Sequence, residues 1–200
     1  MRRSGIRLLL AALLAPKTAL AHAGAHGPTE IFLDGALATL TRPEGLLPML
    51  ALGIGIALAG RDGLFRALPW MLAGLGAGVL AAGWIDLDMA ALALVLGAAL
   101  VLPIALLGQG LPRLATLPLA ALTCGATTAG VLQGQGTGNA PLAETLGVFL
   151  TAPAPATLTF FAARLLLWPP CPRRHIALRI VASWITAIAL MSLALLLRPI

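Results

Sequence analysis

The chain has 200 residues, of which 60% are hydrophobic and only 10% are charged, whereas soluble domains carry about 25% charged residues. So few charges cannot cover the surface of so apolar a chain, which excludes a water-soluble globule, and the high hydrophobicity excludes a disordered chain. The formal charge of +6 does not indicate a nucleic-acid partner, because the arginines lie in short gaps between apolar blocks and no basic stripe is interleaved with aromatic residues.

The first 21 residues are typical of a secretory signal peptide. Arg2, Arg3 and Arg7 form a basic start, a short apolar stretch follows, and residues 19–21 form an Ala-Leu-Ala cleavage site. The alternative is an uncleaved first transmembrane helix, but the apolar run from Leu8 is far shorter than the ~20 residues that a bilayer requires. We therefore predict that residues 1–21 are removed and that residues 22–200 form a single domain.

Cleavage after residue 21 would make His22 the mature N-terminus, with His26 shortly after it. A free α-amine beside an imidazole can chelate a divalent transition metal, and a second imidazole can add a further ligand. We therefore hypothesise that His22 and His26 capture a metal ion. The alternative is a polar tail that only favours cleavage.

Beyond the signal peptide, the chain contains six apolar blocks. They lie near residues 43–60, 67–85, 89–108, 113–132, 144–168 and 176–197. Most have the ~20 residues that a helix needs to cross the hydrocarbon core. The segment Ile31–Thr41 is apolar but short, and we interpret it as interfacial or re-entrant. The sequence thus predicts an all-α fold, a polytopic transmembrane bundle of about six helices.

The arginines in the gaps predict the orientation of the bundle. If the mature N-terminus is outside, the outer gaps hold only Arg42 and Arg198. The cytoplasmic side then holds Arg61, Arg66, Arg113, Arg164, Arg173, Arg174 and Arg179. This bias predicts a multi-pass protein of a bacterial-type inner membrane, with its mature N-terminus on the periplasmic side.

Three charged residues, Glu44, Glu144 and Arg164, fall within or at the ends of predicted spans. An ionisable residue inside a membrane is a functional candidate, because its burial in lipid is costly. All three lie near predicted interfaces, however. This depth favours an anchoring role with the charge in water for each of them.

A polar, glycine-rich stretch, Gln133 to Asn139, follows the predicted fourth helix. Its glycines permit backbone conformations that other residues avoid, so carbonyl groups and the side chains of Gln133, Gln135 and Asn139 could converge on a cation. A flexible external turn is the simpler interpretation of the same residues.

The fifth block contains Pro153 and Pro155 between Thr151 and Thr157. Each proline lacks a backbone N–H and clashes with the carbonyl group four residues back, so regular helical bonding must be interrupted here. Broken helices often flank transport sites, which makes Thr151 a candidate for lining a cavity, although many proline kinks are only structural.

Catalytic motifs are not found in the sequence. The histidines His22, His26 and His175 form no metalloprotease or Ser/His/Asp arrangement, and His175 lies beside two arginines as an expected surface residue. We therefore expect a protein that is not an enzyme and that holds no permanently bound cofactor.

Two segments carry a resemblance to family motifs. Residues 35–53 read GALATLTRPEGLLPMLALG and resemble the pattern G-F-x-H-P-x-x-G-x-D-H-L-L-x-M-x-A-x-G. Glu44 takes the aspartate position, whereas Ala38 and Gly45 take the two histidine positions. Residues 132–138 read LQGQGTG and resemble F-H-G-H-x-H-G, with glutamine or threonine where the histidines would be.

These motifs, the signal peptide, the His-x-Gly mature start and the short helices make the chain similar to the HupE/UreJ family of hydrogenase and urease accessory membrane proteins. The resemblance implies uptake or delivery of nickel or cobalt. His22, His26 and Glu44 would then bind the metal outside the membrane, and Gln133, Gln135, Asn139 and Thr151 would line the path. Because amide and hydroxyl oxygens suit harder cations than imidazole does, the missing histidines imply altered or weakened metal selectivity.

A second function class is also compatible with the sequence. The chain could be a non-transporting membrane scaffold of the same fold that binds protein partners through glycine-rich helix faces, and a homo-oligomer is equally compatible. A transporter requires a hydrated polar path from Glu44 and Gln133 to the inner side. A scaffold can be dry throughout.

Overall fold

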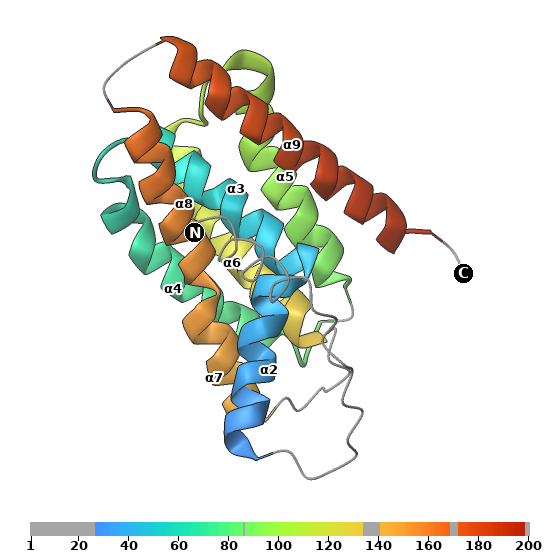
Figure 1. Ribbon diagram of the computed structural model, residues 1–200. Coiled ribbons are helices and arrows are strands. Elements are labelled where there is room, and N and C mark those ends of the chain that lie inside the picture. Colours follow the sequence, from blue (N-terminus) through green and yellow to red (C-terminus); the bar gives the residue numbers. More distant parts are fainter. Residues whose placement is uncertain (1–26, 86, 134–140, 169–171, 199–200) are drawn as a thin grey trace, which may run out of the picture.

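The computed structural model describes residues 27–85, 87–133, 141–168 and 172–198, and its regular structure is helical (Figure 1). The helices in chain order are α2 (Pro28–Thr41), α3 (Pro43–Ala59), α4 (Gly63–Ala81), α5 (Met89–Leu107), α6 (Arg113–Gln133), α7 (Leu142–Thr151), α8 (Pro153–Leu166) and α9 (Pro172–Leu196). The predicted all-α bundle is confirmed for the described part of the chain. The predicted signal peptide lies outside the described residues.

Five helical stretches are long and apolar enough to cross a membrane, and there are six if the bent pair α2 and α3 forms one span. α7 and α8 together form one of the five, Leu142–Leu166, which corresponds to the predicted block 144–168. α3 corresponds to the block 43–60 and has 17 residues. The count agrees with the prediction of about six helices.

Pro43 causes the break between α2 and α3. A residue that precedes proline is pushed out of the α region, and Arg42 accordingly has an extended backbone with a ψ of 134°. The two helices are bent by 62° at this break. The segment Ile31–Thr41 lies within α2, and a bend of this size is the geometry of a broken span or a re-entrant loop.

α3 is the central helix of the bundle. It packs against α5, α6, α8 and α9, and every residue from Ala51 to Ala57 is buried. A helix that is apolar on all sides requires neighbours all round it. The main core therefore forms around α3, with Met49, Leu52 and Ile56 among its buried side chains.

Glycines mark the places where helix backbones approach each other most closely. A Cβ added at several of them would collide with a carbonyl oxygen of a neighbouring helix, among them Gly35 with Glu144, Gly53 with Ala156, Gly74 with Ala121 and Gly78 with Gly125. Small residues allow the close packing that holds helices together in lipid. These contacts join α2 to α7, α3 to α8 and α4 to α6.

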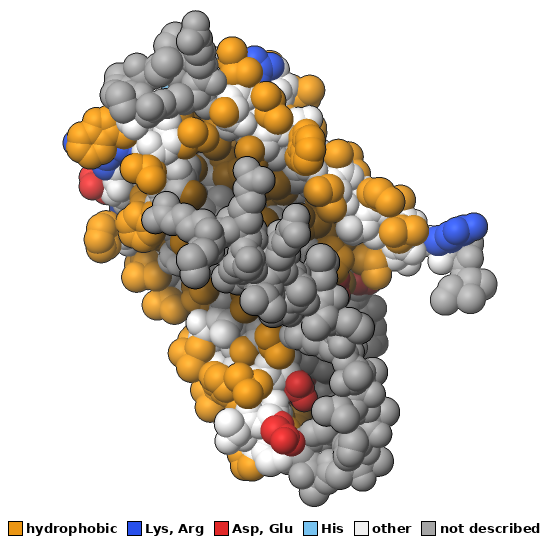
Figure 2. All heavy atoms as spheres, viewed as in Figure 1, with side chains coloured by type: hydrophobic (Ala, Val, Ile, Leu, Met, Phe, Trp, Pro, Cys, Tyr) orange, Lys and Arg blue, Asp and Glu red, His pale blue; other side chains and the backbone are white. Residues whose placement is uncertain are grey.

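The outside of the bundle is apolar. Figure 2 shows hydrophobic side chains over most of the described surface on the side in view, while charged side chains lie toward the ends. Leu80, Phe65 and Leu114 are 72%, 80% and 89% exposed. An apolar surface of this extent is expected where helices face lipid, so the fold is that of a multi-pass membrane protein.

Candidate functional site

Acidic residues and arginines gather at opposite ends of the bundle, whose helices can be followed in Figure 1. We call the end at which α2 and α7 begin the acidic end, and it carries Glu30, Asp34, Asp88 and Glu144. The other end, at which α4, α6 and α9 begin, is the arginine end, and it carries Arg61, Arg66, Arg113, Arg164 and Arg179. The arginine bias in the sequence is thus a bias between the two ends of one bundle.

Glu144 is buried at the contact between α2 and α7. Its side chain is 6% exposed, and its Oε1 atom has no hydrogen-bond partner. Gly35 of α2 lies so close that a Cβ there would collide with the Glu144 carbonyl oxygen. A buried acceptor without a partner costs roughly 1–3 kcal/mol, and more when it is charged. The carboxylate therefore destabilises the fold in which it is held.

The burial of Glu144 corrects a sequence-based prediction. Its position near a helix start favoured an anchor with the charge in water. The structure instead covers the side chain with α2, a helix distant from α7 in the sequence. The charged groups that act on Glu144 electrostatically are Arg42 and Asp34. Glu144 is thus enclosed at the acidic end rather than anchored in water.

The first motif-like segment packs against Leu132, where the second one starts, near this carboxylate; residues 134–138 of the second segment lie outside the described residues. Ala38, at a histidine position of the first segment, packs with Val131, Leu132 and Val148. Leu132 is the first residue of the second motif-like segment. Val148 follows Glu144 by one turn of α7, so this contact between α2, α6 and α7 lies one helical turn from the buried carboxylate.

Gln133 ties the end of α6 to the connection between α4 and α5. Its Oε1 accepts a hydrogen bond from the Met89 backbone N–H at 3.3 Å, and its Nε2 donates to the Ile85 carbonyl at 2.8 Å. Both ends of the amide are thus bonded to backbone groups. These bonds give Gln133 a structural role, and the cavity-lining role that the sequence suggested stays a prediction.

Gln133→Leu should lower the free energy of unfolding by about 1–3 kcal/mol, because two backbone groups lose their partner. Thermal unfolding in detergent measures the change. Gln109→Leu is the matched control, since Gln109 is exposed in the connection between α5 and α6. Equal shifts in the two variants would contradict the role assigned to Gln133.

Other predicted site residues lie at separate places. Glu44 is partly buried in the first turn of α3, where the helix dipole favours a negative charge. Gly45, at the second histidine position, faces the Thr39 carbonyl across the bend between α2 and α3. The Thr151 hydroxyl donates to the Gly147 carbonyl of its own helix at 2.7 Å. Outside the described residues lie His22, His26, Gln135 and Asn139.

A row of threonines that sequence reasoning missed runs along the core side of α6. Thr116, Thr123 and Thr127 share this side with Ala120 and Cys124, because spacings of three and four residues fall on one helix face. Ala120 and Cys124 belong to the core around α3. The hydroxyl groups of Thr123 and Thr127 are buried and have no hydrogen-bond partner. Polar groups therefore lie inside an otherwise apolar core.

Arginines cap the helices that finish at the arginine end. At the end of α3, Arg113 Nε donates to the Ala59 carbonyl at 2.6 Å, and Arg164 Nη1 donates to the Ala57 carbonyl at 3.5 Å. Arg179 donates in the same way to carbonyl groups in the last turn of α5. A cation at a helix C-terminus satisfies free carbonyl groups and interacts favourably with the dipole. Arg164 therefore also holds α8 against α3.

Neither clusters of metal ligands nor similarity to known proteins assigns a function to the chain. Across the described ranges, no three His, Cys, Asp or Glu side chains lie close enough together to hold a metal ion. No protein-family model, curated protein or solved structure matches the chain. The functional interpretation therefore depends on the geometry of the two ends and on the motif-like segments.

Proposed function

We propose that this chain is a membrane protein of the HupE/UreJ type that takes up or delivers a divalent metal ion, nickel or cobalt. The supporting observation is Glu144, which is buried with an unbonded carboxylate oxygen one helical turn from the contact between the first motif-like segment and Leu132. A buried carboxylate with an oxygen that lacks a hydrogen bond is unfavourable, and a bound cation would compensate its charge.

Metal capture in this proposal begins at the mature N-terminus. His22 and His26 directly precede α2 in the sequence. Glu30 is in the first turn of α2, and Asp34 is one turn further toward Glu144. Imidazole nitrogen and carboxylate oxygen together suit a divalent transition metal. The two histidines would therefore bind the ion first and pass it to Glu144.

Glu44, at the start of α3, would act with the histidines as an entrance carboxylate. Further inward, the proposed route uses the free hydroxyl groups of Thr127 and Thr123 on α6. Hydroxyl oxygens are weak, neutral donors for a transition metal. They would hold the ion loosely enough for it to move on. We propose facilitated movement down the ion gradient.

Uptake into proteoliposomes tests this proposal. Vesicles that contain the protein should accumulate Ni²⁺ or Co²⁺ faster than protein-free vesicles, as measured with an ion-sensitive dye inside them. Glu144→Gln should slow uptake by roughly tenfold, the factor that corresponds to 1.4 kcal/mol. Asp62→Asn is the matched control, because Asp62 is an exposed acidic residue at the opposite end.

Uptake rates that do not depend on the protein would contradict transport. That result would favour the scaffold, in which the same bundle binds protein partners through its helix faces. An equal reduction of the uptake rate in Glu144→Gln and Asp62→Asn would show that overall charge, rather than the buried carboxylate, controls uptake.

A further inference from the structure

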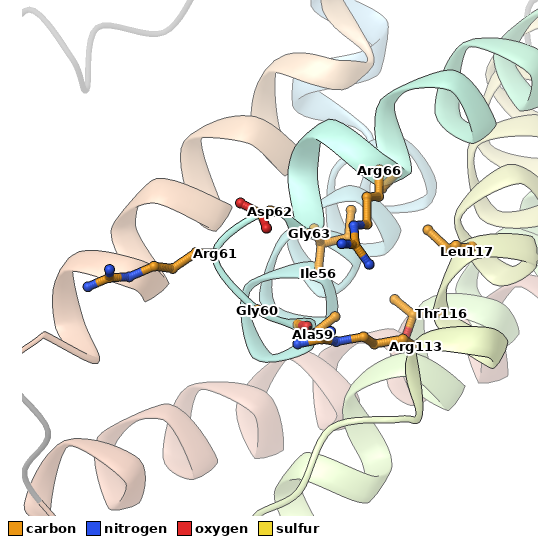
Figure 3. Close-up of a pocket in the computed structure, with 11 residues that line it drawn as sticks. Ile56, Ala59, Gly60, Arg61, Asp62, Gly63, Arg66, Arg113, Thr116 and Leu117 are labelled. Atoms are coloured by element: carbon orange, nitrogen blue, oxygen red, sulfur yellow. Dashed lines mark hydrogen bonds between the residues drawn. The ribbon is translucent and has the colours of Figure 1, made fainter.

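A small cavity lies at the arginine end, between the end of α3 and the first turns of α4 and α6 (Figure 3). Its volume is about 70 Å³, whereas about 10–15 Å³ of such space suffices for one water molecule. Ile56 and Leu117 contribute apolar wall, and Arg66, Arg113 and Thr116 contribute polar groups. The cavity has room for a small anion.

Two guanidinium groups from different helices reach this space. Figure 3 shows the Arg66 side chain between α4 and α6 and the Arg113 side chain extending from α6 toward Ala59 and Gly60, whereas Arg61 points away. Arg61 lies instead over the ring of Trp168, 5.6 Å from its centroid. Asp62 is the acidic residue among the lining side chains. The lining therefore has an excess of positive charge.

Arg113 is already fixed in position. Its Nε donates to the Ala59 carbonyl at 2.6 Å, which uses one of the five N–H donors of a guanidinium group. Gly60, with a φ of 130°, keeps the neighbouring turn open, because a Cβ there would lie 2.9 Å from Arg113 Nη2. A side chain held in this way loses little further conformational entropy when it binds a ligand.

The starts of two helices add to the positive potential. α4 begins at Gly63 and α6 begins at Arg113, and both residues line the cavity. The N-cap residue of α4, Asp62, makes no side-chain hydrogen bond to the first turn. Helix N-termini carry a partial positive charge and free N–H groups, so they favour an anion at this place.

We propose that this cavity binds the phosphate group of an anionic phospholipid. Phosphate oxygens match the planar N–H fork of arginine. Phe65 and Leu114, which adjoin the two arginines in sequence, are 80% and 89% exposed on the apolar surface, where acyl chains would lie beside a bound headgroup. Basic pockets between membrane helices on the cytoplasmic side suit such headgroups, and the arginine bias predicts that side for this end.

Native mass spectrometry with phosphatidylglycerol or phosphatidylcholine tests the proposal. We expect the protein to retain phosphatidylglycerol about fivefold more than phosphatidylcholine, the ratio that corresponds to ~1 kcal/mol for one arginine near the surface. Arg66→Gln should remove most of this preference, and Arg66→Lys should keep part of it, because lysine keeps the charge without the fork. Arg61→Gln is the matched control and should keep all of it.

Equal retention of the two lipids by the unmodified protein would overturn the proposal. An equal loss of the phosphatidylglycerol preference in Arg61→Gln and Arg66→Gln would also overturn it. Inorganic phosphate is the second probe, and displacement of bound phosphatidylglycerol by millimolar phosphate would overturn the lipid as the source of the phosphate group. Melting curves show that each variant is folded. Arg113→Gln tests the site from α6 and should lower phosphatidylglycerol retention as Arg66→Gln does.

Discussion

Gly74→Ala should destabilise the bundle, whereas Gly76→Ala, in the same helix, should leave it unchanged or stabilise it. A Cβ at Gly74 would collide with the Ala121 carbonyl oxygen of α6, but a Cβ at Gly76 has nothing within 4 Å. Overpacking of a tight contact costs about 1–3 kcal/mol. Alanine in a helix interior is favoured over glycine by roughly 1 kcal/mol. The two substitutions should therefore have opposite effects.

Thermal unfolding of both variants in one detergent, followed by circular dichroism, measures this difference. Gly78→Ala should repeat the Gly74 result, because its added Cβ would collide with the Gly125 carbonyl oxygen and lie 2.9 Å from Thr128 Cβ. If Gly74→Ala and Gly76→Ala shift the melting temperature in the same direction, the close contact between α4 and α6 does not exist.

Glu144→Gln should weaken nickel binding by roughly tenfold or more, equivalent to 1.4 kcal/mol, and should preserve or raise the melting temperature. The carboxylate is buried and one of its oxygens has no hydrogen-bond partner, so removal of its charge relieves an unfavourable group while it removes the proposed metal ligand. A residue retained for function at the expense of stability gives this opposed pair of effects.

The pair of measurements separates a functional role from a structural one. Isothermal titration calorimetry gives the nickel affinity, and a melting curve of the same preparation gives the stability. Asp62→Asn should change neither, because Asp62 is exposed at the arginine end. A large loss of stability in Glu144→Gln without a change in nickel affinity would make Glu144 a packing residue and would remove it from the proposed metal site.

The helices and the break after Arg42 could be predicted from the sequence because their causes are local. Apolar blocks of bilayer length indicate spans, and Pro43 forces the preceding residue into an extended conformation. The distinction between Gly74 and Gly76 could not be predicted, because both are small residues in one block. Only the position of α6 shows which of them contacts a neighbouring backbone.

The environment of the candidate site residues depends on contacts between distant parts of the chain. Glu144 lies near the start of a span in the sequence, and its burial comes from α2. Gln133 lies in a polar stretch that suggests a cation site, yet its partners are backbone groups of Ile85 and Met89. The helical spacing of Thr123 and Thr127 is visible in the sequence, but the absence of partners for their hydroxyl groups is a property of the packed core.

The central claim, metal capture at the acidic end, is tested most directly by nickel and cobalt titration of the purified, signal-cleaved protein beside a His22→Ala/His26→Ala variant. We predict that the unmodified protein binds the metal with a micromolar Kd, which corresponds to a binding free energy of about −8 kcal/mol. The double variant should lose this binding. The absence of binding by either form would contradict metal capture and leave the scaffold as the function to pursue.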